Sequence, residues 1–511
     1  MQRSLEGSVR VQALALWRRL EHGFDAALGS AGNPLRHLGS LGFLLVWLLA
    51  LSGIWLYAAI DTSAAGAWRS IDSLSREQWW AGGVLRSLHR YGADAFVVVT
   101  LAHLLREWLH GRYASFRRYS WLTGVVLLPL AFVCAIGGFW LNWDRLGQFS
   151  AEATAEWLDT LPLFASPLVR NFIGVAAVSD RLFSLFVFVH LGVPLLLVFG
   201  LWAHVQRLAR VEVFPPRAIA LGTSVALLAL ALAAPVLSQP PADLSRVPTA
   251  LALDWILLFV HPLAYAISGQ ATWLLLGGAL ALLIALPFLP ARALPAPVAV
   301  VDPANCNGCR RCFEDCPYEA ITMAPHPRRA GRQLAVVDPD QCASCGICVG
   351  ACPSSTPFRS IETLVTGIDM PQQPIDAVRR RVLGGLAALS GERRYVVFGC
   401  ERGADARSVA APDVVASSLI CTGMLPPSFV EYALRGGADG VVVAGCRDGG
   451  CEFRLGTRWI EQRLAGAREP HLRASVPRER LRVVQADAGE EARLAAALDE
   501  LRHATTRGAI A

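Results

Sequence analysis

Residues 82–113 read GGVLRSLHRYGADAFVVVTLAHLLREWLHGRY, and this stretch decides how the first half of the chain is interpreted. We interpret it as a membrane-spanning helix that carries two histidines, His89 and His103. Fourteen residues separate them. At about 100° and about 1.5 Å per residue, both side chains return to nearly one face, roughly 21 Å apart along the axis. A second apolar stretch, residues 181–208, repeats the arrangement with His190 and His204.

The repeated histidine spacing predicts a pair of haem sites. Ionisable side chains inside a membrane helix are costly, so four of them at one spacing indicate a shared purpose. Neutral imidazole is a good axial ligand for haem iron, and two facing helices would hold two stacked b-type haems. If both helices enter the membrane from the same side, His89 pairs with His190 and His103 with His204. The alternative for any single histidine is a hydrogen-bonded packing residue.

Two further apolar segments carry glycines at the same spacing. Gly39 and Gly53 lie on the first segment, and Gly124 and Gly138 lie on the third. Because glycine has no Cβ, these positions would let a haem edge approach the backbone closely. Either pair alone also fits ordinary helix packing in a membrane.

The 511-residue chain divides into an apolar part and a polar part. Apolar runs dominate residues 39–290, where we predict six spans, at about 39–60, 82–110, 120–141, 182–207, 217–238 and 271–290. Arginine-rich loops on one side place both termini in the cytoplasm, in a multi-pass protein of the bacterial cytoplasmic (inner) membrane. His89 and His190 would then lie near the outer face. The net charge of +6 is not concentrated enough to indicate nucleic-acid binding.

The first 290 residues resemble the cytochrome b of bc-type quinol-oxidising complexes. The matching positions are Gly39, Gly53, Arg86, Gly92, Arg106, Gly124, Gly138 and Pro194 together with the four histidines. The resemblance implies an all-α transmembrane di-haem bundle in the lipid bilayer, quinone binding and a homodimer. It also implies that Arg86 and Arg106 pair with haem propionates; the alternative is two interfacial charges near helix ends.

Two segments depart from the quinone-site pattern of that family. Where the family has Pro-Glu-Trp-Tyr, this chain has Leu253-Asp254-Trp255-Ile256, and Leu-Pro-Trp-Gly becomes Leu141-Asn142-Trp143-Asp144. Asp254 and Trp255 are candidates for an outer quinone site, because a carboxylate beside an apolar pocket can accept a quinol proton. The alternative for Asp254 is a helix N-cap. His37, at the cytoplasmic end of the first span, is a candidate for an inner quinone site.

Twelve of the thirteen cysteines follow residue 305, in spacings that fit metal ligation in a reducing compartment. A Pro/Ala-rich linker, residues 291–300, precedes two C-x2-C-x2-C-x3-C-P runs within 301–365. This pattern resembles two-cluster bacterial ferredoxins, small α+β domains with two 4Fe–4S clusters, and zinc is the competing interpretation. The fourth cysteine of each run crosses over, so the two ligand sets are Cys306, Cys309, Cys312 and Cys352, and Cys342, Cys345, Cys348 and Cys316.

Residues 390–511 predict an α/β domain with a small parallel sheet. Candidate strands at 395–399, 414–420, 440–445 and 481–486 alternate with helices near 428–435, 457–465 and 489–503. Three strands end directly in a cysteine, and loops at the carboxyl ends of parallel strands meet at one edge. Four thiolates at that edge would suit a 2Fe–2S cluster or zinc: Cys400, Cys421, Cys446 and Cys451.

The C-terminal segment resembles the delta subunit of methyl-viologen-reducing hydrogenases. The residues that carry the resemblance are Cys421-Thr-Gly, Gly437-Ala-Asp-Gly440, Gly445-Cys446 and Cys451. That family has several clustered cysteines at the first site, where this chain has only Cys400. The resemblance implies an electron adaptor to a flavin-containing partner.

These segments together predict the membrane subunit of a quinone oxidoreductase. Electrons would pass between a cytosolic flavoprotein or dehydrogenase subunit and the quinone pool, through one 2Fe–2S cluster, two 4Fe–4S clusters and two b haems. The reverse direction, in which quinol oxidation drives reduction of a cytosolic acceptor, is an alternative. A different class of function is a redox-responsive membrane anchor for a partner enzyme.

Overall fold

The computed structural model describes residues 2–163, 166–172, 178–246, 250–289 and 297–507. The chain folds into two compact units. The first, called the membrane unit below, comprises Met1–Gln206 and Val211–Pro290, and the second, called the cysteine-rich unit, comprises Arg207–Arg210 and Ala291–Ala511. The predicted domains 301–365 and 390–511 therefore lie in one unit. Most of the predicted linker, residues 291–296, lies outside the described residues.

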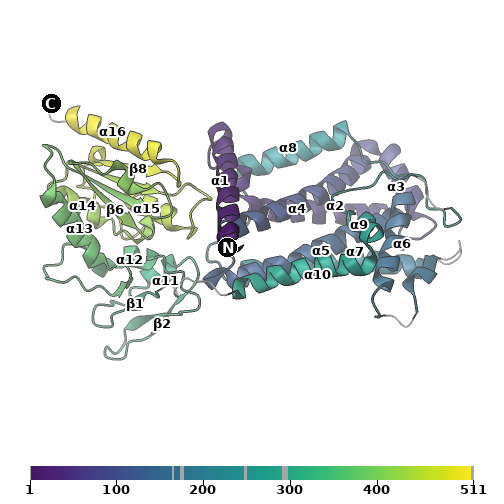
Figure 1. The fold of residues 1–511 in the computed structure, drawn as a ribbon, viewed down its shortest axis with the longest axis horizontal. Coiled ribbons are helices and arrows are strands. Elements are labelled where there is room, and N and C mark those ends of the chain that lie inside the picture. Colours follow the sequence, from purple (N-terminus) through teal and green to yellow (C-terminus); the bar gives the residue numbers. More distant parts are fainter. Residues whose placement is uncertain (1, 164–165, 173–177, 247–249, 290–296, 508–511) are drawn as a thin grey trace. The chain divides into compact units, whose positions relative to one another are not determined.

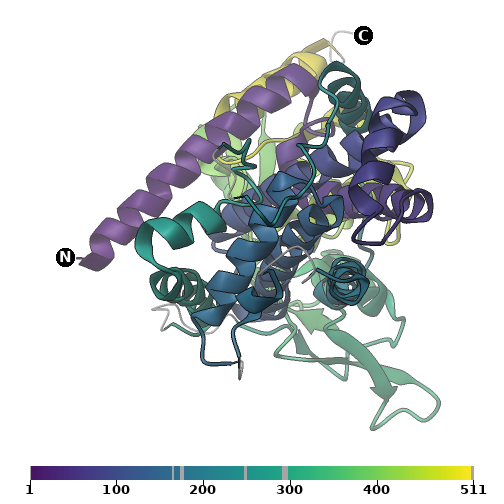
Figure 2. The ribbon, with the colours of Figure 1, turned by 90° about the vertical axis from the view of Figure 1, so that its right-hand side faces the viewer.

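All the named secondary-structure elements of the membrane unit are helices. Their bounds are α1 Gln2–Leu28, α2 Leu38–Ala59, α3 Ala67–Arg76, α4 Val84–Leu109, α5 Arg118–Asn142, α6 Arg145–Asp159, α7 Asp180–Val205, α8 Arg217–Ala233, α9 Val260–Ile267 and α10 Gly269–Ala285. Helices α2, α4, α5, α7, α8 and α10 run side by side, and Figure 2 views them nearly end-on. Helix α1 lies at one end of this bundle and α3, α6 and α9 lie at the other (Figure 1).

Four helical segments are long and apolar enough to cross a membrane: Leu38–Ala59, Ser115–Asn142, Asp180–Val205 and Gly269–Phe288. They correspond to four of the six predicted spans. Helix α4 has 26 residues but carries charged side chains at both ends, which lowers its mean hydropathy. Helix α8 is apolar but has only 17 residues. The spans at 82–110 and 217–238 therefore stay predictions.

The bundle is organised as two helix pairs. Helix α2 packs along α4, and α5 packs along α7. A buried apolar cluster that includes Leu45, Phe96 and Leu127 joins the pairs. Many other apolar side chains of these helices are exposed, as expected where lipid rather than protein covers a helix. The four predicted histidines lie on α4 and α7, and the four glycines lie on their partners α2 and α5.

The first part of the cysteine-rich unit is a small α+β region. Two short antiparallel pairs, β1 Val300–Val301 with β4 Ile368–Asp369 and β2 Ile321–Pro325 with β3 Gln333–Val337, frame two one-turn helices, α11 Arg311–Asp315 and α12 Ile347–Ala351. The hairpin β2–β3 occupies the stretch between the two cysteine runs. Helices α11 and α12 pack against each other.

The second part of this unit is a four-stranded parallel sheet in the order β6-β5-β7-β8, so the parallel sheet predicted from sequence is confirmed. The strands are β5 Tyr395–Cys400, β6 Val414–Leu419, β7 Gly440–Gly445 and β8 Leu481–Gln485. The helices are α13 Ile375–Ala388, α14 Ser428–Arg435, α15 Gly456–Ala465 and α16 Glu491–Arg507.

The two faces of the sheet follow from the period-two alternation of its side chains. Val396 and Phe398 point to a core that includes residues of α13, α14 and α15, while Val397 and Val442 point to a second core with Leu498 of α16. Helices therefore cover both faces (Figure 1), as parallel sheets require. This leaves the carboxyl edge of the sheet, where the cysteines lie, for chemistry.

Candidate redox centres

Each predicted histidine faces one of the predicted glycines across a helix pair. On α2, Gly53 faces His89 and Gly39 faces His103 of α4. On α5, Gly138 faces His190 and Gly124 faces His204 of α7, which completes the set. A Cβ on Gly124 or Gly138 would lie 2.9 Å from the imidazole Cε1 of its histidine, and one on Gly53 would lie 3.0 Å away. The glycines thus make room for the imidazole rings themselves.

The structure brings together the histidines that the sequence paired. The ring centroids of His89 and His190 lie 6.2 Å apart at an interplanar angle of 73°. His103 and His204 form the second pair, close enough to influence each other electrostatically. Two histidine pairs are therefore held inside the bundle, each between the two glycines that face it.

Three of the four imidazoles have their Nδ1 atom fixed by a hydrogen bond. Ser52 Oγ lies 3.0 Å from Nδ1 of His89, Thr123 Oγ1 lies 3.1 Å from Nδ1 of His204, and the Cys134 carbonyl lies 2.8 Å from Nδ1 of His190. Ser52 and Thr123 donate their own protons to backbone carbonyls, so their oxygens accept from Nδ1. These contacts fix the tautomer and leave Nε2 as the ligand atom.

This arrangement fits b-type haem. Imidazoles with a free Nε2 and an anchored Nδ1–H are the usual axial ligands, and the surrounding side chains are apolar. Haem would be held by the pair His89 and His190 and by the pair His103 and His204. Its iron would supply a one-electron carrier within the membrane.

The two arginines predicted near haem propionates have protein partners. Arg86 donates to Ser75 Oγ at 2.6 Å and to Asn142 Oδ1 at 2.9 Å. Arg106 is buried and pairs with Glu21 of α1, with Nε 2.7 Å from Oε1. Both side chains are thus positioned near the helix ends, and their pairing with propionates stays a prediction.

The predicted quinone residues lie at opposite ends of the membrane unit. The Asp254 carboxylate accepts from the N–H groups of Ile256 at 2.9 Å and Leu257 at 2.8 Å, as an N-cap does, and it also pairs with Arg90. Trp255 beside it is 70% exposed. His37 is half-buried at the N-cap position of α2.

The eight cysteines of the two runs line two small cavities, with four cysteines around each. The sets are the two that the crossing pattern predicted, Cys306, Cys309, Cys312 and Cys352 around one cavity and Cys316, Cys342, Cys345 and Cys348 around the other. Four thiolates around a closed space fit a 4Fe–4S cluster, which would supply a one-electron carrier. Cys309 is exposed, whereas the other seven are buried or half-buried.

Backbone conformation repeats at equivalent positions of the two runs. The second residue after the first cysteine has positive φ, 67° at Gly308 and 58° at Ser344, and so does the residue after the second cysteine, 65° at Arg310 and 73° at Gly346. Such left-handed residues turn successive N–H groups inward and form an anion-binding nest. The nests fit the negative charge of thiolate-bound iron and sulfide.

Burial controls the protonation of the thiols when no metal is bound. It raises the pKa of Cys312 to about 12, and it raises the pKa of Cys345 and Cys348 above their ordinary range as well. Because iron binds the thiolate, loading of these sites releases protons. The buried thiols therefore fit a structural role as ligands.

Four more cysteines meet at the carboxyl edge of the parallel sheet, and all four are buried. Cys400 ends β5, Cys421 and Cys446 follow β6 and β7, and Cys451 lies in the next loop. The Sγ atoms of Cys400 and Cys446 are 3.7 Å apart. Hydrogen bonds from Cys421 and Cys446 lower the pKa of both Cys400 and Cys451. The set fits a third thiolate-held centre.

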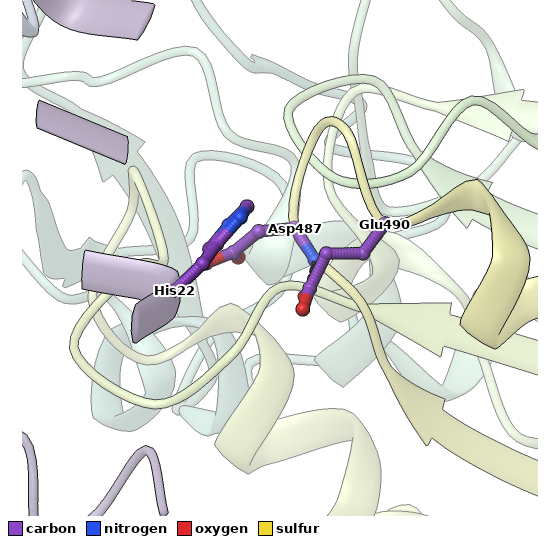
Figure 3. Close-up of side chains that lie close together, drawn as sticks. All are labelled: His22, Asp487 and Glu490. Atoms are coloured by element: carbon purple, nitrogen blue, oxygen red, sulfur yellow. Dashed lines mark hydrogen bonds between the residues drawn. The ribbon is translucent and has the colours of Figure 1, made fainter. Parts of the chain in front are cut away.

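Arg447, directly after Cys446, is anchored by two carboxylates from the loop after β8. Its Nε donates to Glu490 Oε2 at 2.7 Å, and its N–H donates to Asp487 Oδ1 at 2.9 Å. Figure 3 draws these two carboxylates and also labels His22 of α1, which belongs to the membrane unit. The anchor fixes the loop that carries Cys446 and Cys451.

Sequence reasoning did not single out Ser52 and Thr123, although a signal was present. Each directly precedes one of the predicted glycines, Gly53 and Gly124. It also passed over Asp315 and Arg463, a buried ion pair in the cysteine-rich unit. A charged residue on an amphipathic helix is usually solvated, so burial of Arg463 depends on the tertiary packing.

Comparison with known proteins gives three matches along the chain. Residues 30–211 match the model of cytochrome b/b6/petB, residues 305–356 match the 4Fe–4S dicluster domain, and residues 397–506 match the delta subunit of methyl-viologen-reducing hydrogenase. Each resemblance proposed from the sequence is thereby confirmed.

Two individual proteins are also similar. Cytochrome b of Allochromatium vinosum is 27% identical over 173 residues, which cover 34% of this chain and 42% of that protein. The chain thus spans less than half the length of this relative. A structure described as a hyperthermophilic respiratory Complex III matches 50% of this chain and 75% of its own, at 19% identity and a TM-score of 0.40.

The match to cytochrome b indicates haem b binding, and the match to the 4Fe–4S dicluster domain indicates iron–sulfur binding. With four helices apolar enough to span, they indicate a multi-pass membrane protein with an electron-transfer role. The chain joins a segment similar to cytochrome b, a segment similar to 4Fe–4S dicluster domains and a segment similar to the delta subunit of methyl-viologen-reducing hydrogenase.

Proposed function

We propose that the protein is the membrane subunit of a quinone oxidoreductase that passes electrons between a cytosolic redox partner and the quinone pool. The observation that carries this proposal is the presence, in one chain, of paired histidines inside apolar helices and of three groups of four cysteines. Haems and iron–sulfur clusters supply one-electron carriers when bound. We propose two haems, two 4Fe–4S clusters and one 2Fe–2S cluster.

The residues of the membrane unit orient the ligands and exclude water. Hydrogen bonds at Nδ1 hold His89, His190 and His204 in one rotamer each. Apolar side chains such as Leu45 and Phe96 form a buried cluster between the helix pairs that carry the histidines. Ligands held rigidly in an apolar site reorganise little when the charge of the centre changes.

The residues of the cysteine-rich unit hold negative charge and present one site to solvent. Backbone N–H groups donate to thiolates, as Ala320 does to Cys316 at 3.3 Å and Gly423 does to Cys421 at 3.4 Å. The exposure of Cys309 supports electron exchange with a soluble partner at that site. We propose that this partner is a flavoprotein or dehydrogenase subunit, in line with the match to the hydrogenase delta subunit.

Asp254 is the proposed proton acceptor of an outer quinone site. Its carboxylate pairs with Arg90, the residue after His89, and Trp255 stands exposed beside it. A carboxylate at such a position can accept a proton when quinol is oxidised, and can return it in the other direction. His37 is the proposed polar residue of an inner site.

Quinone reduction by the full chain in liposomes tests the proposal, with reduced methyl viologen as donor and a short-chain quinone as acceptor. We expect Cys348→Ser and His190→Ala each to slow the reaction at least about tenfold, because each removes one ligand of a carrier. His261→Ala is the matched control, since it removes a buried imidazole that lies outside the two histidine pairs. Equal rates in all four proteins would contradict the proposal, and partner binding without quinone turnover would favour an anchor.

A further inference from the structure

Within the cysteine-rich unit, the elements that carry two of the cysteine groups pack closely against each other. Helix α12, which carries Cys348, packs against a short 3-10 helix after β6, η8 Thr422–Met424, and η8 packs against α15. Gly350, Gly423 and Gly456 stand at these contacts, where any Cβ would meet neighbouring backbone or sulfur. Close packing of this kind brings the Cys348 group and the Cys421 group together.

Arg463 of α15 lies in this contact, and its side chain is fully buried. One guanidinium nitrogen, Nη1, donates to the Gly423 carbonyl at 2.8 Å, and the other, Nη2, forms an ion pair with Asp315. Nη2 is also 3.4 Å from the Ile347 carbonyl. Gly423 lies two residues after Cys421, Asp315 directly precedes Cys316, and Ile347 directly precedes Cys348. Arg463 therefore contacts the backbone or a side chain next to cysteines of both groups.

The charge around Arg463 is not balanced by protein carboxylates. Asp315 also pairs with Arg468, whose guanidinium stacks 3.5 Å above the Trp459 ring, so two cations share one carboxylate. The Nε atom of Arg463 is buried and has no hydrogen-bond partner among the described residues. A buried cation with an unused donor is costly unless an anion lies nearby. Thiolate-held centres at Cys348 and Cys421 would supply that negative charge.

We propose that Arg463 is a positioning residue whose fixed positive charge favours the reduced state of both neighbouring centres, held by Cys421 and by Cys348. Each exchange between these centres moves one electron from one centre to the other, and no proton or bond change is needed. The charge stabilises whichever centre holds the added electron. The inference rests on the proposed electron-transfer function, but it concerns potentials that exist without quinone turnover.

The test is a redox titration of the purified full chain, followed by electron paramagnetic resonance. The signal lost in Cys421→Ser identifies the C-terminal centre, and the signal lost in Cys348→Ser identifies its neighbour. In Arg463→Met we expect both midpoint potentials to fall, with the ratio of reduced to oxidised centre at a fixed potential about tenfold lower, or about 59 mV for one electron. Arg463→Lys keeps the charge and is expected to restore most of the shift.

A second variant tests the proposal even if Arg463→Met loses its clusters. Asp315→Asn removes the neutralising carboxylate, so we expect both potentials to rise. The centre held by Cys306, Cys309, Cys312 and Cys352 is the internal reference, and its potential should change less in every variant. If both variants keep their clusters, unchanged potentials in Arg463→Met and Asp315→Asn would overturn the inference. If Arg463→Met holds no clusters, unchanged potentials in Asp315→Asn alone would overturn it. If these shifts are present but the unsubstituted chain does not reduce quinone, the result would instead count against the proposed function.

Discussion

At the scale of single residues, the membrane unit is defined by what surrounds each imidazole. A glycine faces the ring, and for His89, His190 and His204 an oxygen atom holds Nδ1. A hydrogen bond alone also occurs where a histidine simply packs between helices, because buried polar groups are ordinarily hydrogen-bonded. The combination of both features at repeated positions favours ligation over packing.

The first residue-scale prediction concerns haem content. His89→Ala is expected to reduce bound haem b from two per chain to one, because the pair His89 and His190 loses one of its two iron ligands. Haem extracted from the purified protein measures this. His261→Ala is the control: His261 is also buried, but its Nε2 contacts Ser150 Oγ at 3.1 Å and it lies outside the two pairs. Equal haem loss in both variants would contradict the assignment.

A second prediction at this scale concerns the glycines. Gly124→Ala would place a Cβ 2.9 Å from Cε1 of His204, so the ring must move. We expect partial loss of the haem held by His103 and His204, seen as a smaller haem absorbance per protein. Gly277→Ala on α10 is the matched control, because a Cβ there meets nothing within 4 Å. A full haem complement in Gly124→Ala would show that the close approach is not required.

At the scale of elements, the cysteine-rich unit depends on helices that approach closely. A Cβ added at Gly350 of α12 would collide with the Gly423 carbonyl and would lie 2.6 Å from Nη1 of Arg463. Gly384 of α13 has open space. Gly350→Ala should therefore destabilise this unit by about 1–3 kcal/mol through overpacking, whereas Gly384→Ala should stabilise it by about 0.5–1 kcal/mol as a helix substitution. Thermal unfolding measures both, and shifts of the same sign would contradict the packing described.

Asp369, at the end of β4, gives the contact between β4 and the start of α13 a pH dependence. The Asp369 carboxylate accepts from the N–H of Ile375 at 3.1 Å, and burial raises its pKa from 3.8 to about 6. The folded protein binds this proton more tightly than the unfolded chain, so the stabilisation is present below about pH 4 and is lost as the pH rises through about 6. Unfolding temperature should thus fall from pH 5 to pH 7, and fall less in Asp369→Asn. Identical slopes would show that another group is responsible.

At the scale of the whole molecule, repeated patterns were predictable and tertiary contacts were not. The strands β5, β6, β7 and β8 start at the predicted residues, because buried parallel strands read as continuous apolar runs. Helices α6 and α13 were not predicted, since both mix polar with apolar residues. Their formation depends on the surfaces against which they pack.

The same division holds for the candidate centres. The ligand sets could be predicted from the spacing of the cysteines and histidines, because a metal or haem site imposes a fixed separation on its ligands. The positive φ of Arg310 and Ser344 could not be read from residue type, as it could at Gly308 and Gly346. Burial of Arg463 could not be read either, since Asp315 lies far from it in the chain.

The most direct test of the account is anaerobic rapid mixing of the full chain in liposomes with reduced methyl viologen, while haem absorbance and cluster signals are recorded together. The account predicts that the clusters are reduced first and the haems follow, and that Cys316→Ser delays the haems without changing their number. Haems that stay oxidised while every cluster is reduced would contradict electron transfer between the two units.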